Sequence, residues 1–249
     1  DFNLLTEDRT SQPIPEGVQV INKENIFIEE GATISFSSLN ASKGPIYIGK
    51  DAEIMEGCLV RGPFAMCEHS VLKMGAKVYG ATTLGPFCKV GGEVNNSVLF
   101  GFSSKGHEGF LGNSVLGEWC NVGADTNTSN LKNNYAEVKL WNYQVERFTN
   151  TSLQFCGLMM GDHSKCGINT MFNTGTVIGV SANIFGSGFP RNFIPSFSWG
   201  GAAGFTTYQL NKVIEVAKVV MKRRELEWSE IDEKILQHVF DETAKNRAK

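Results

Sequence analysis

The sequence contains few histidines, no paired cysteines and no long apolar run, and each of these absences excludes a class of protein. Only 4 histidines occur in 249 residues and no two are near one another, so a zinc site of closely spaced histidines is not predicted. The 6 cysteines form no Cys-x-x-Cys pair, which favours small buried thiols over metal ligands or disulfides. No stretch of about 18 apolar residues is present, so we expect no membrane span. A net charge of −3 argues against a nucleic-acid-binding protein, which would carry a basic face.

Two further signals are missing. No Gly-x-Ser-x-Gly elbow is present, so a serine hydrolase of that type is not predicted. The chain begins at Asp1 without a methionine or a targeting segment. We therefore expect a cytoplasmic protein, and we interpret the sequence as part of a longer one.

A six-residue repeat is the strongest positive signal. Every sixth residue from 48 to 90 is apolar: Ile48, Ile54, Val60, Met66, Leu72, Val78, Leu84 and Val90. A small residue usually stands two positions earlier, as in Ala52, Cys58, Ser70, Ala76, Thr82 and Cys88. This period matches neither a helix nor an isolated alternating strand. It is typical of a β solenoid, in which the large residue fills the bore and the small one lies near a corner.

The repeat also suggests how the chain is divided. Residues 1–22 are polar and aperiodic, and we expect a linker or arm there. The repeat extends over residues 23–205, with interruptions at about 95–109 and 130–153 that we expect to be loops pushed out from corners. From residue 206 the composition predicts two helices.

Both predicted helices have recognisable start signals and apolar faces. Thr206 or Thr207 is a candidate cap for the first helix, and Ser229 with Asp232 offers a capping box for the second. The inward residues expected are Leu210, Val213, Ile214, Ala217, Val220 and Met221, and then Ile231, Ile235, Val239 and Phe240. The run Lys222, Arg223 and Arg224 favours a solvated face at a helix end, with phosphate binding as the alternative.

His107 is the best candidate for chemistry among the histidines. It lies in the first predicted loop, between Gly106 and Gly109, which allow the backbone to approach a ligand. His69 and His163 occupy corners of regular coils, where outward polar residues are ordinary, and His238 lies in the tail. An imidazole is well suited to accept a proton at neutral pH.

The period resembles that of the hexapeptide-repeat acyltransferases. A longer motif resembles the acetyltransferase half of the bifunctional enzymes that acetylate glucosamine-1-phosphate and then uridylylate it. The matching segments are Lys105-Gly-His107-x-x-Phe110-Leu-Gly112, Leu116-Gly-x4-Val122-Gly-Ala124 and Ser129-Asn130. This resemblance implies an all-β fold: a single-stranded, left-handed parallel β-helix (a hexapeptide-repeat solenoid) with a C-terminal α-helical tail. The left hand comes from the resemblance alone.

The resemblance also assigns roles to single residues. His107 falls on the catalytic base and Ala124 on the residue whose backbone N–H faces the thioester oxygen. Asn121 precedes that turn, and Asn130 falls on a sugar-contacting asparagine. Lys77 aligns with an arginine of the sugar-phosphate site.

Three positions depart from the family pattern. Phe110 and Leu131 stand in place of tyrosines, and Asn95 in place of a phosphate-binding lysine. Lys105 and Lys139, each expected in one of the two loops, are candidates to replace that lysine.

The resemblance implies an acetyl-CoA-dependent N-acetyltransferase for an amino-sugar phosphate, with glucosamine-1-phosphate as the expected acceptor. Acetyl-CoA is then the co-substrate, this domain requires no metal, and the family assembly is a homotrimer. The stretches Arg9–Pro13 and Pro195–Gly200 resemble a bacterial variant in which a nucleotidyltransferase domain precedes the β-helix. The alternative function is a non-catalytic trimerisation or regulatory β-helix of a sugar-phosphate nucleotidyltransferase.

Overall fold

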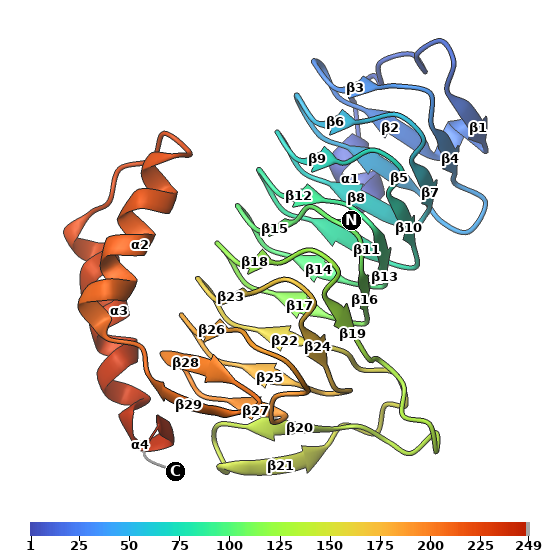
Figure 1. The fold of residues 1–249 in the computed structure, drawn as a ribbon. Coiled ribbons are helices and arrows are strands. Elements are labelled where there is room, and N and C mark those ends of the chain that lie inside the picture. Colours follow the sequence, from blue (N-terminus) through green and yellow to red (C-terminus); the bar gives the residue numbers. More distant parts are fainter. Residues whose placement is uncertain (248–249) are drawn as a thin grey trace.

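The computed structural model describes residues 1–247, which form a solenoid of three parallel sheets followed by helices (Figure 1). Sheet A contains β1 (Gln19–Ile21), β4 (Ser38–Asn40), β7 (Leu59–Arg61), β10 (Lys77–Tyr79), β13 (Glu93–Asn95) and β16 (Phe110–Gly112). Sheet B contains β2 (Ile26–Ile28), β5 (Ile46–Ile48), β8 (Phe64–Met66), β11 (Thr82–Leu84), β14 (Val98–Leu99), β17 (Val115–Leu116), β22 (Met159–Met160), β25 (Val177–Ile178) and β27 (Phe193–Ile194). Sheet C contains β3 (Thr33–Ile34), β6 (Glu53–Ile54), β9 (Val71–Leu72), β12 (Lys89–Val90), β15 (Ser104–Lys105), β18 (Asn121–Val122), β23 (Lys165–Cys166), β26 (Asn183–Ile184), β28 (Ser198–Gly201) and β29 (Gly204–Thr207). A small additional sheet pairs β19 (Asn127–Thr128) with β24 (Met171–Phe172).

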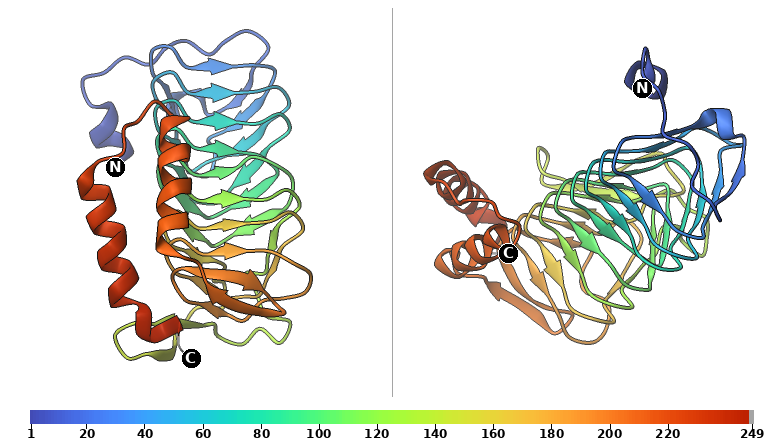
Figure 2. Two further views of the ribbon diagram at one scale, coloured as in Figure 1. Left: turned by 60° about the vertical axis from the view of Figure 1, so that its left-hand side comes forward. Right: turned by 90° about the horizontal axis from the view of Figure 1, so that it is seen from above.

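Each complete coil contributes one strand to each face, and neighbours within a face come from successive coils. The pairing between coils is parallel and in register, as in Val60 opposite Val78 on sheet A, and within the three sheets only β29 pairs antiparallel, with β28 at the end of sheet C. The coils wind with a left hand (Figures 1 and 2). The predicted all-β, left-handed parallel β-helix with a helical C-terminal tail is confirmed.

The bore contains the residues that the six-residue period selected. The eight apolar residues that recur every sixth position from Ile48 to Val90 are all at most 3% exposed. The small residues two positions earlier are buried as well, including Cys58 and Cys88 at 0%. Burial of large apolar side chains, at roughly 25 cal/mol per Å², is the main contribution that holds the coils together.

Residues 95–109 do not form the predicted loop. They contain β14 and β15, which pair in register with the coils on either side. The inward residues are Val90, Val94, Leu99, Lys105 and Leu111. The six-residue count fails here because two corners are shortened and because one inward residue is a lysine.

Residues 130–153 leave the solenoid as an insertion. They include an antiparallel hairpin of β20 (Lys139–Asn142) and β21 (Arg147–Asn150), which lies at the C-terminal end of the coils (Figure 1). An ion pair of 2.5 Å between Glu146 and Lys245 joins the hairpin to the helical tail.

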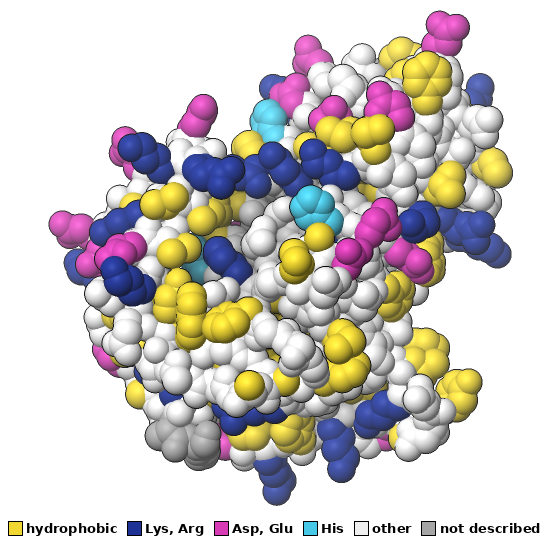
Figure 3. Space-filling view, in the orientation of Figure 1, with side chains coloured by type: hydrophobic (Ala, Val, Ile, Leu, Met, Phe, Trp, Pro, Cys, Tyr) yellow, Lys and Arg dark blue, Asp and Glu magenta, His cyan; other side chains and the backbone are white. Residues whose placement is uncertain are grey.

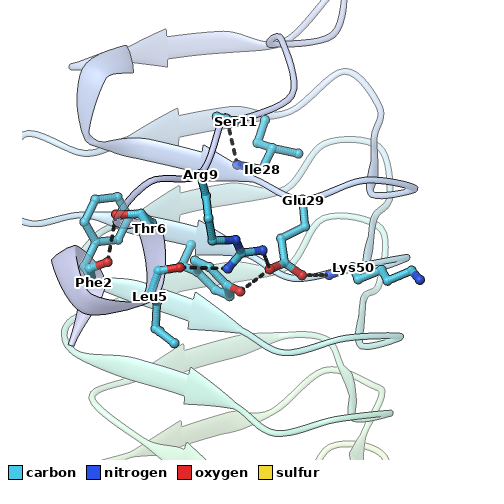
Figure 4. A network of polar contacts seen from close by, with 9 residues as sticks. Phe2, Leu5, Thr6, Arg9, Ser11, Ile28, Glu29 and Lys50 are labelled. Carbon is cyan, nitrogen blue, oxygen red and sulfur yellow. Dashed lines mark hydrogen bonds and ion pairs between the residues drawn. The ribbon is translucent and has the colours of Figure 1, made fainter.

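The N-terminal arm is fixed to the first coils. It contains α1 (Phe2–Thr6), and a short 3₁₀ turn, η1 (Lys23–Asn25), follows β1. Arg9 pairs with Glu29, which also accepts hydrogen bonds from the Tyr47 hydroxyl at 2.5 Å and from the Lys50 backbone N–H at 2.7 Å (Figure 4). The Arg9 and Tyr47 hydrogen bonds help hold the Glu29 pKa below its usual range, although burial, the largest single influence, raises it. Residues 1–22 are therefore a docked arm, and β1 is a full strand of sheet A.

The helical tail consists of α2 (Leu210–Lys222), α3 (Glu230–Glu242) and α4 (Ala244–Arg247), and α2 lies along the edge of the solenoid (Figure 2). The predicted capping box of Ser229 and Asp232 is confirmed. The predicted cap of the first helix is wrong, because Thr206 and Thr207 belong to β29, which pairs with β28, and Gln209 takes the cap position.

The buried face of α2 contains Val213, Ala217 and Met221. Ile231 and Ile235, which were expected to face inward, are 67% and 55% exposed. No helix within residues 1–247 is long and apolar enough to cross a bilayer.

An aromatic stack occupies the corner between sheets B and C. Each member comes from a different coil, has a left-handed backbone conformation and stacks on the ring of the next coil: His69, Phe87, Phe102, Trp119 and His163. The ring centroids of Phe102 and Trp119 are 4.2 Å apart. His163 ends this stack beside Val213 and Ala217 of α2, so it is a covered residue and not an ordinary outward one.

Candidate functional site

His107 lies at the corner between β15 and β16, with its side chain exposed. Gly109 makes this corner possible, because a Cβ added there would lie 2.1 Å from the carbonyl oxygen of Thr126 in the next coil. Gly109 also has φ +114°, a conformation that L side chains rarely adopt. The predicted site is thus a tight turn between stacked strands.

Lys105 fixes this corner from inside the solenoid. Its side chain is 2% exposed and lies between Val90 and Val122 in the inward column of sheet C. Its ammonium donates a hydrogen bond of 2.5 Å to the backbone carbonyl of His107. Burial lowers the pKa of Lys105 to about 8, against the opposing charges of Glu108 and Asp125. Lys105 therefore does not extend toward solvent as a replacement phosphate ligand.

The next coil places Ala124 beside His107. Ser104 pairs with Asn121, and the Asp125 N–H donates to the Glu108 carbonyl at 3.0 Å, so the two corners remain in register. Within residues 1–247 the Ala124 N–H has no hydrogen-bond acceptor. Asn121 is exposed on sheet C, just before this corner.

Charged and aromatic groups line sheet A next to the corner. Glu108 forms an ion pair with Lys77 at 3.4 Å. The Tyr79 hydroxyl donates to Glu93, which raises the pKa of Tyr79 to about 12. Lys77, Tyr79 and Glu93 are at one end of an open groove of about 750 Å³ on the outer face of sheet A. Tyr79 and Glu93 were not predictable from the sequence, because outward strand residues carry no signal in the six-residue period.

Three of the predicted residues meet around Gly112. Asn95 pairs with Gly112, and a Cβ added to that glycine would lie 2.5 Å from the Phe110 ring and 2.7 Å from Nδ2 of Asn130. Asn130 donates to the Asn113 side chain at 2.8 Å. The structure therefore brings Asn95, Phe110 and Asn130 together around Gly112, at the last strand of sheet A.

Lys139 does not join this group. It lies in the hairpin, and its carbonyl is close to Gly175 at a later corner of the solenoid. Leu131 makes an isolated bridge with Phe155 at the base of the insertion. Within residues 1–247, no group of three or more His, Cys, Asp or Glu side chains is arranged to hold a metal ion.

The arrangement can support transfer of an acyl group to an amine. An exposed imidazole can take the amine proton, and a neighbouring free backbone N–H can stabilise a developing oxyanion. Both groups are held by the rigid stacking of adjacent coils.

Several solved structures to which this chain is similar are at most 14% identical to it, with TM-scores of 0.38 or less. No family model matches the chain, and no curated protein matches it. The polySia-specific acetyltransferase NeuO is 10% identical, with 76% of this chain and 78% of NeuO covered and a TM-score of 0.37. LpxA, a UDP-N-acetylglucosamine acyltransferase from Bacteroides fragilis, is 14% identical, with 92% and 84% covered and a TM-score of 0.38. AntD, an N-acyltransferase from Bacillus cereus in complex with dTDP and 3-hydroxybutyryl-CoA, is 11% identical, with 84% and 91% covered and a TM-score of 0.32.

Proposed function

We propose that this chain is an acetyl-CoA-dependent N-acetyltransferase for an amino-sugar phosphate, with glucosamine-1-phosphate as the expected acceptor. The product would feed the synthesis of UDP-N-acetylglucosamine and cell-envelope precursors in the cytoplasm. The observation that carries the proposal is the corner of His107. Its imidazole is exposed, its carbonyl is held by Lys105, and the free N–H of Ala124 lies in register on the next coil.

In the proposed reaction the amine of the acceptor attacks the thioester carbon of acetyl-CoA. The imidazole of His107 takes the proton that the amine loses, and the Ala124 N–H donates to the oxyanion. Collapse of this intermediate forms the amide and releases CoA as the thiolate, which recovers a proton. Positioning of the two substrates supplies the rest of the rate enhancement.

The surroundings of His107 fit a phosphorylated sugar. Lys77, paired with Glu108, supplies a positive charge on the sheet A side, and Asn130 and Asn95 supply amide groups around Gly112. Phe110 offers a flat apolar surface of the kind on which a sugar ring can rest. Phe110 stands where the related enzymes have a tyrosine, so contact with the ring replaces a hydroxyl hydrogen bond.

The active assembly is proposed to be a homotrimer. The groove beside Lys77 is open, so a single solenoid does not enclose a ligand. Ile21 and Leu59 in this groove are 54% and 57% exposed, and Val219 and Ile231 on the tail helices are 61% and 67% exposed. Closed symmetric assembly would cover such side chains and complete the acetyl-CoA site between neighbouring coils. An N-terminal nucleotidyltransferase domain in a longer protein remains part of the proposal.

The rival function is a non-catalytic trimerisation or regulatory β-helix, and Phe110, Leu131 and Asn95 are the departures from the family pattern that favour it. A screen of amino-sugar phosphates for CoA release from acetyl-CoA tests the enzymatic function directly. Acetyl-CoA at 100 times its dissociation constant should also stabilise the fold by about 2.7 kcal/mol. No CoA release and no shift in melting temperature would favour the non-catalytic protein.

A further inference from the structure

Four positive side chains, Lys73, Lys89, Arg223 and Arg224, gather at sheet C, and we call them the basic cluster. Lys89 lies on β12, and Lys73 directly follows β9 on the adjacent coil, where its N–H donates to the Val90 carbonyl at 2.7 Å. Figure 3 shows Lys and Arg side chains in a row across this face of the molecule. The cluster thus combines two neighbouring coils with residues more than 130 positions later in the chain.

The position of α2 brings the two arginines to the coils. The helix runs along the solenoid from the last coils toward earlier ones (Figure 2). Met221, which is 9% exposed, anchors its last turn, and the Arg224 N–H donates to the Met221 carbonyl at 2.8 Å. The charge of Arg224 acts on both Cys88 and Lys89, in the coil that carries β12.

The cluster gathers like charges without compensating acids. Burial lowers the pKa of Lys89 most, and the positive charges of Arg224, Lys73 and Arg223 lower it further. Glu53 opposes them with a smaller effect than any of the three. Within the described residues, none of the four side chains forms an ion pair with a carboxylate. Because the whole chain has a net charge of −3, this concentration is local.

We propose that the basic cluster binds the phosphate groups of a ligand that carries two or more phosphates. Arginine supplies a planar guanidinium and lysine a compact ammonium, and both donate hydrogen bonds to phosphate oxygens. Lys89 pairs with Ser104, which lies three residues before His107. A ligand whose phosphates bind the basic cluster can therefore extend from there toward the candidate site. The identity of the ligand as a substrate rests on the proposed function, whereas anion binding itself does not.

Inorganic pyrophosphate is the probe, and titration calorimetry at low salt measures its affinity for the whole chain. Saturable binding that weakens as salt is added is expected for the wild type. Arg224→Gln and Lys89→Gln should each weaken the affinity about tenfold, since each removes one charged hydrogen-bond donor. Lys212→Gln removes the same charge from α2 but lies in an ion pair with Glu215, and it should bind as the wild type does.

Absence of saturable pyrophosphate binding overturns the proposal, as does unchanged affinity in both cluster variants. Each variant's melting temperature is measured first, so that loss of binding in an unfolded variant is not counted as support. A protein that binds pyrophosphate at the cluster but transfers no acetyl group refutes the proposed function and retains the site. An active enzyme whose cluster variants bind normally refutes the site alone.

Two sources could supply such a ligand: the coenzyme, or an acceptor attached to a nucleoside diphosphate. Tighter binding of CoA than of pantetheine, lost in Arg224→Gln, identifies the coenzyme. Tighter binding of a uridine diphosphate sugar than of the free sugar, lost in the same variant, identifies the acceptor. Either result supports the cluster as a phosphate site.

Discussion

The ammonium of Lys105 lies 2.5 Å from the backbone carbonyl of His107, so the corner that carries an exposed histidine is tied to a charge in the bore. Burying a charge costs several kcal/mol unless it is well paired. Leu72 and Val90 occupy the two preceding positions of the same inward column. A lysine among such residues fits a positioning role better than a packing role.

Replacing this charge should separate stability from activity. Lys105→Met keeps most of the side-chain length and removes the buried charge, so the melting temperature should be unchanged or higher. Acetyl transfer should fall about tenfold, since the lost hydrogen bond to the His107 carbonyl is a charged one. The loss should appear in kcat, with KM for acetyl-CoA nearly unchanged. Lys50→Met, at an exposed lysine, is the control, and full activity in Lys105→Met would refute the positioning role.

His163 should make the fold sensitive to acid. Its Nδ1 is buried without a hydrogen-bond partner among residues 1–247, and burial, reinforced by Lys165, lowers its pKa to about 4. The folded pKa lies below the unfolded value of 6.5, so the unfolded chain binds more protons between these values. The stability is fully present above pH 6.5 and is lost progressively as pH falls toward 4.

His163→Gln removes this titration and should flatten the pH dependence. The difference between wild type and variant should change by about 2 kcal/mol between pH 7 and pH 5. Urea unfolding at both values measures it. Identical pH dependence in the two proteins would mean that His163 is protonated while buried.

The bore should tolerate cavities poorly. Leu72 is 0% exposed, and Leu72→Ala should lower the unfolding free energy by about 2–5 kcal/mol. Met74, two residues away, is 67% exposed, so Met74→Ala should cost much less. Denaturant unfolding of both variants compares them, and equal losses would contradict the placement of Leu72.

Assembly is a separate prediction. Light scattering should give a mass about three times the 27.3 kDa of one chain. The exposed apolar residues Val219 and Ile231 are what such an assembly would cover. A monomer at micromolar concentration would remove the proposed site between subunits.

Regular coils could be predicted from sequence because each inward position selects a large apolar residue every sixth step. The prediction failed between Val90 and Leu111, where the inward steps are four, five, six and six residues. Paired glycines at Gly91 and Gly92 allow a shorter corner, which looks in sequence like the start of a loop. The coil that contains β15 could not be recognised from the sequence, because its inward residue is Lys105 and no sequence rule places a lysine in the bore.

The candidate site was predictable only where a motif named its residues. The sequence identified His107 and Ala124, and the structure places them in register on adjacent coils. The hydrogen bond from Lys105 to the His107 carbonyl depends on burial of the lysine in the bore, and the effect of the Arg224 charge on Lys89 depends on packing between distant segments. The helical periodicity of α3 likewise could not show that Ile231 and Ile235 would remain exposed.

The most direct test of the account is the activity of His107→Ala with acetyl-CoA and glucosamine-1-phosphate. The side chain is exposed, so its removal should leave the melting temperature and the assembly nearly unchanged. Loss of a general base should lower acetyl transfer at least about 100-fold. His238→Ala, at an exposed histidine of α3, should retain full activity. If His107→Ala keeps more than about a third of the wild-type rate, another group takes the proton and the assigned mechanism is wrong.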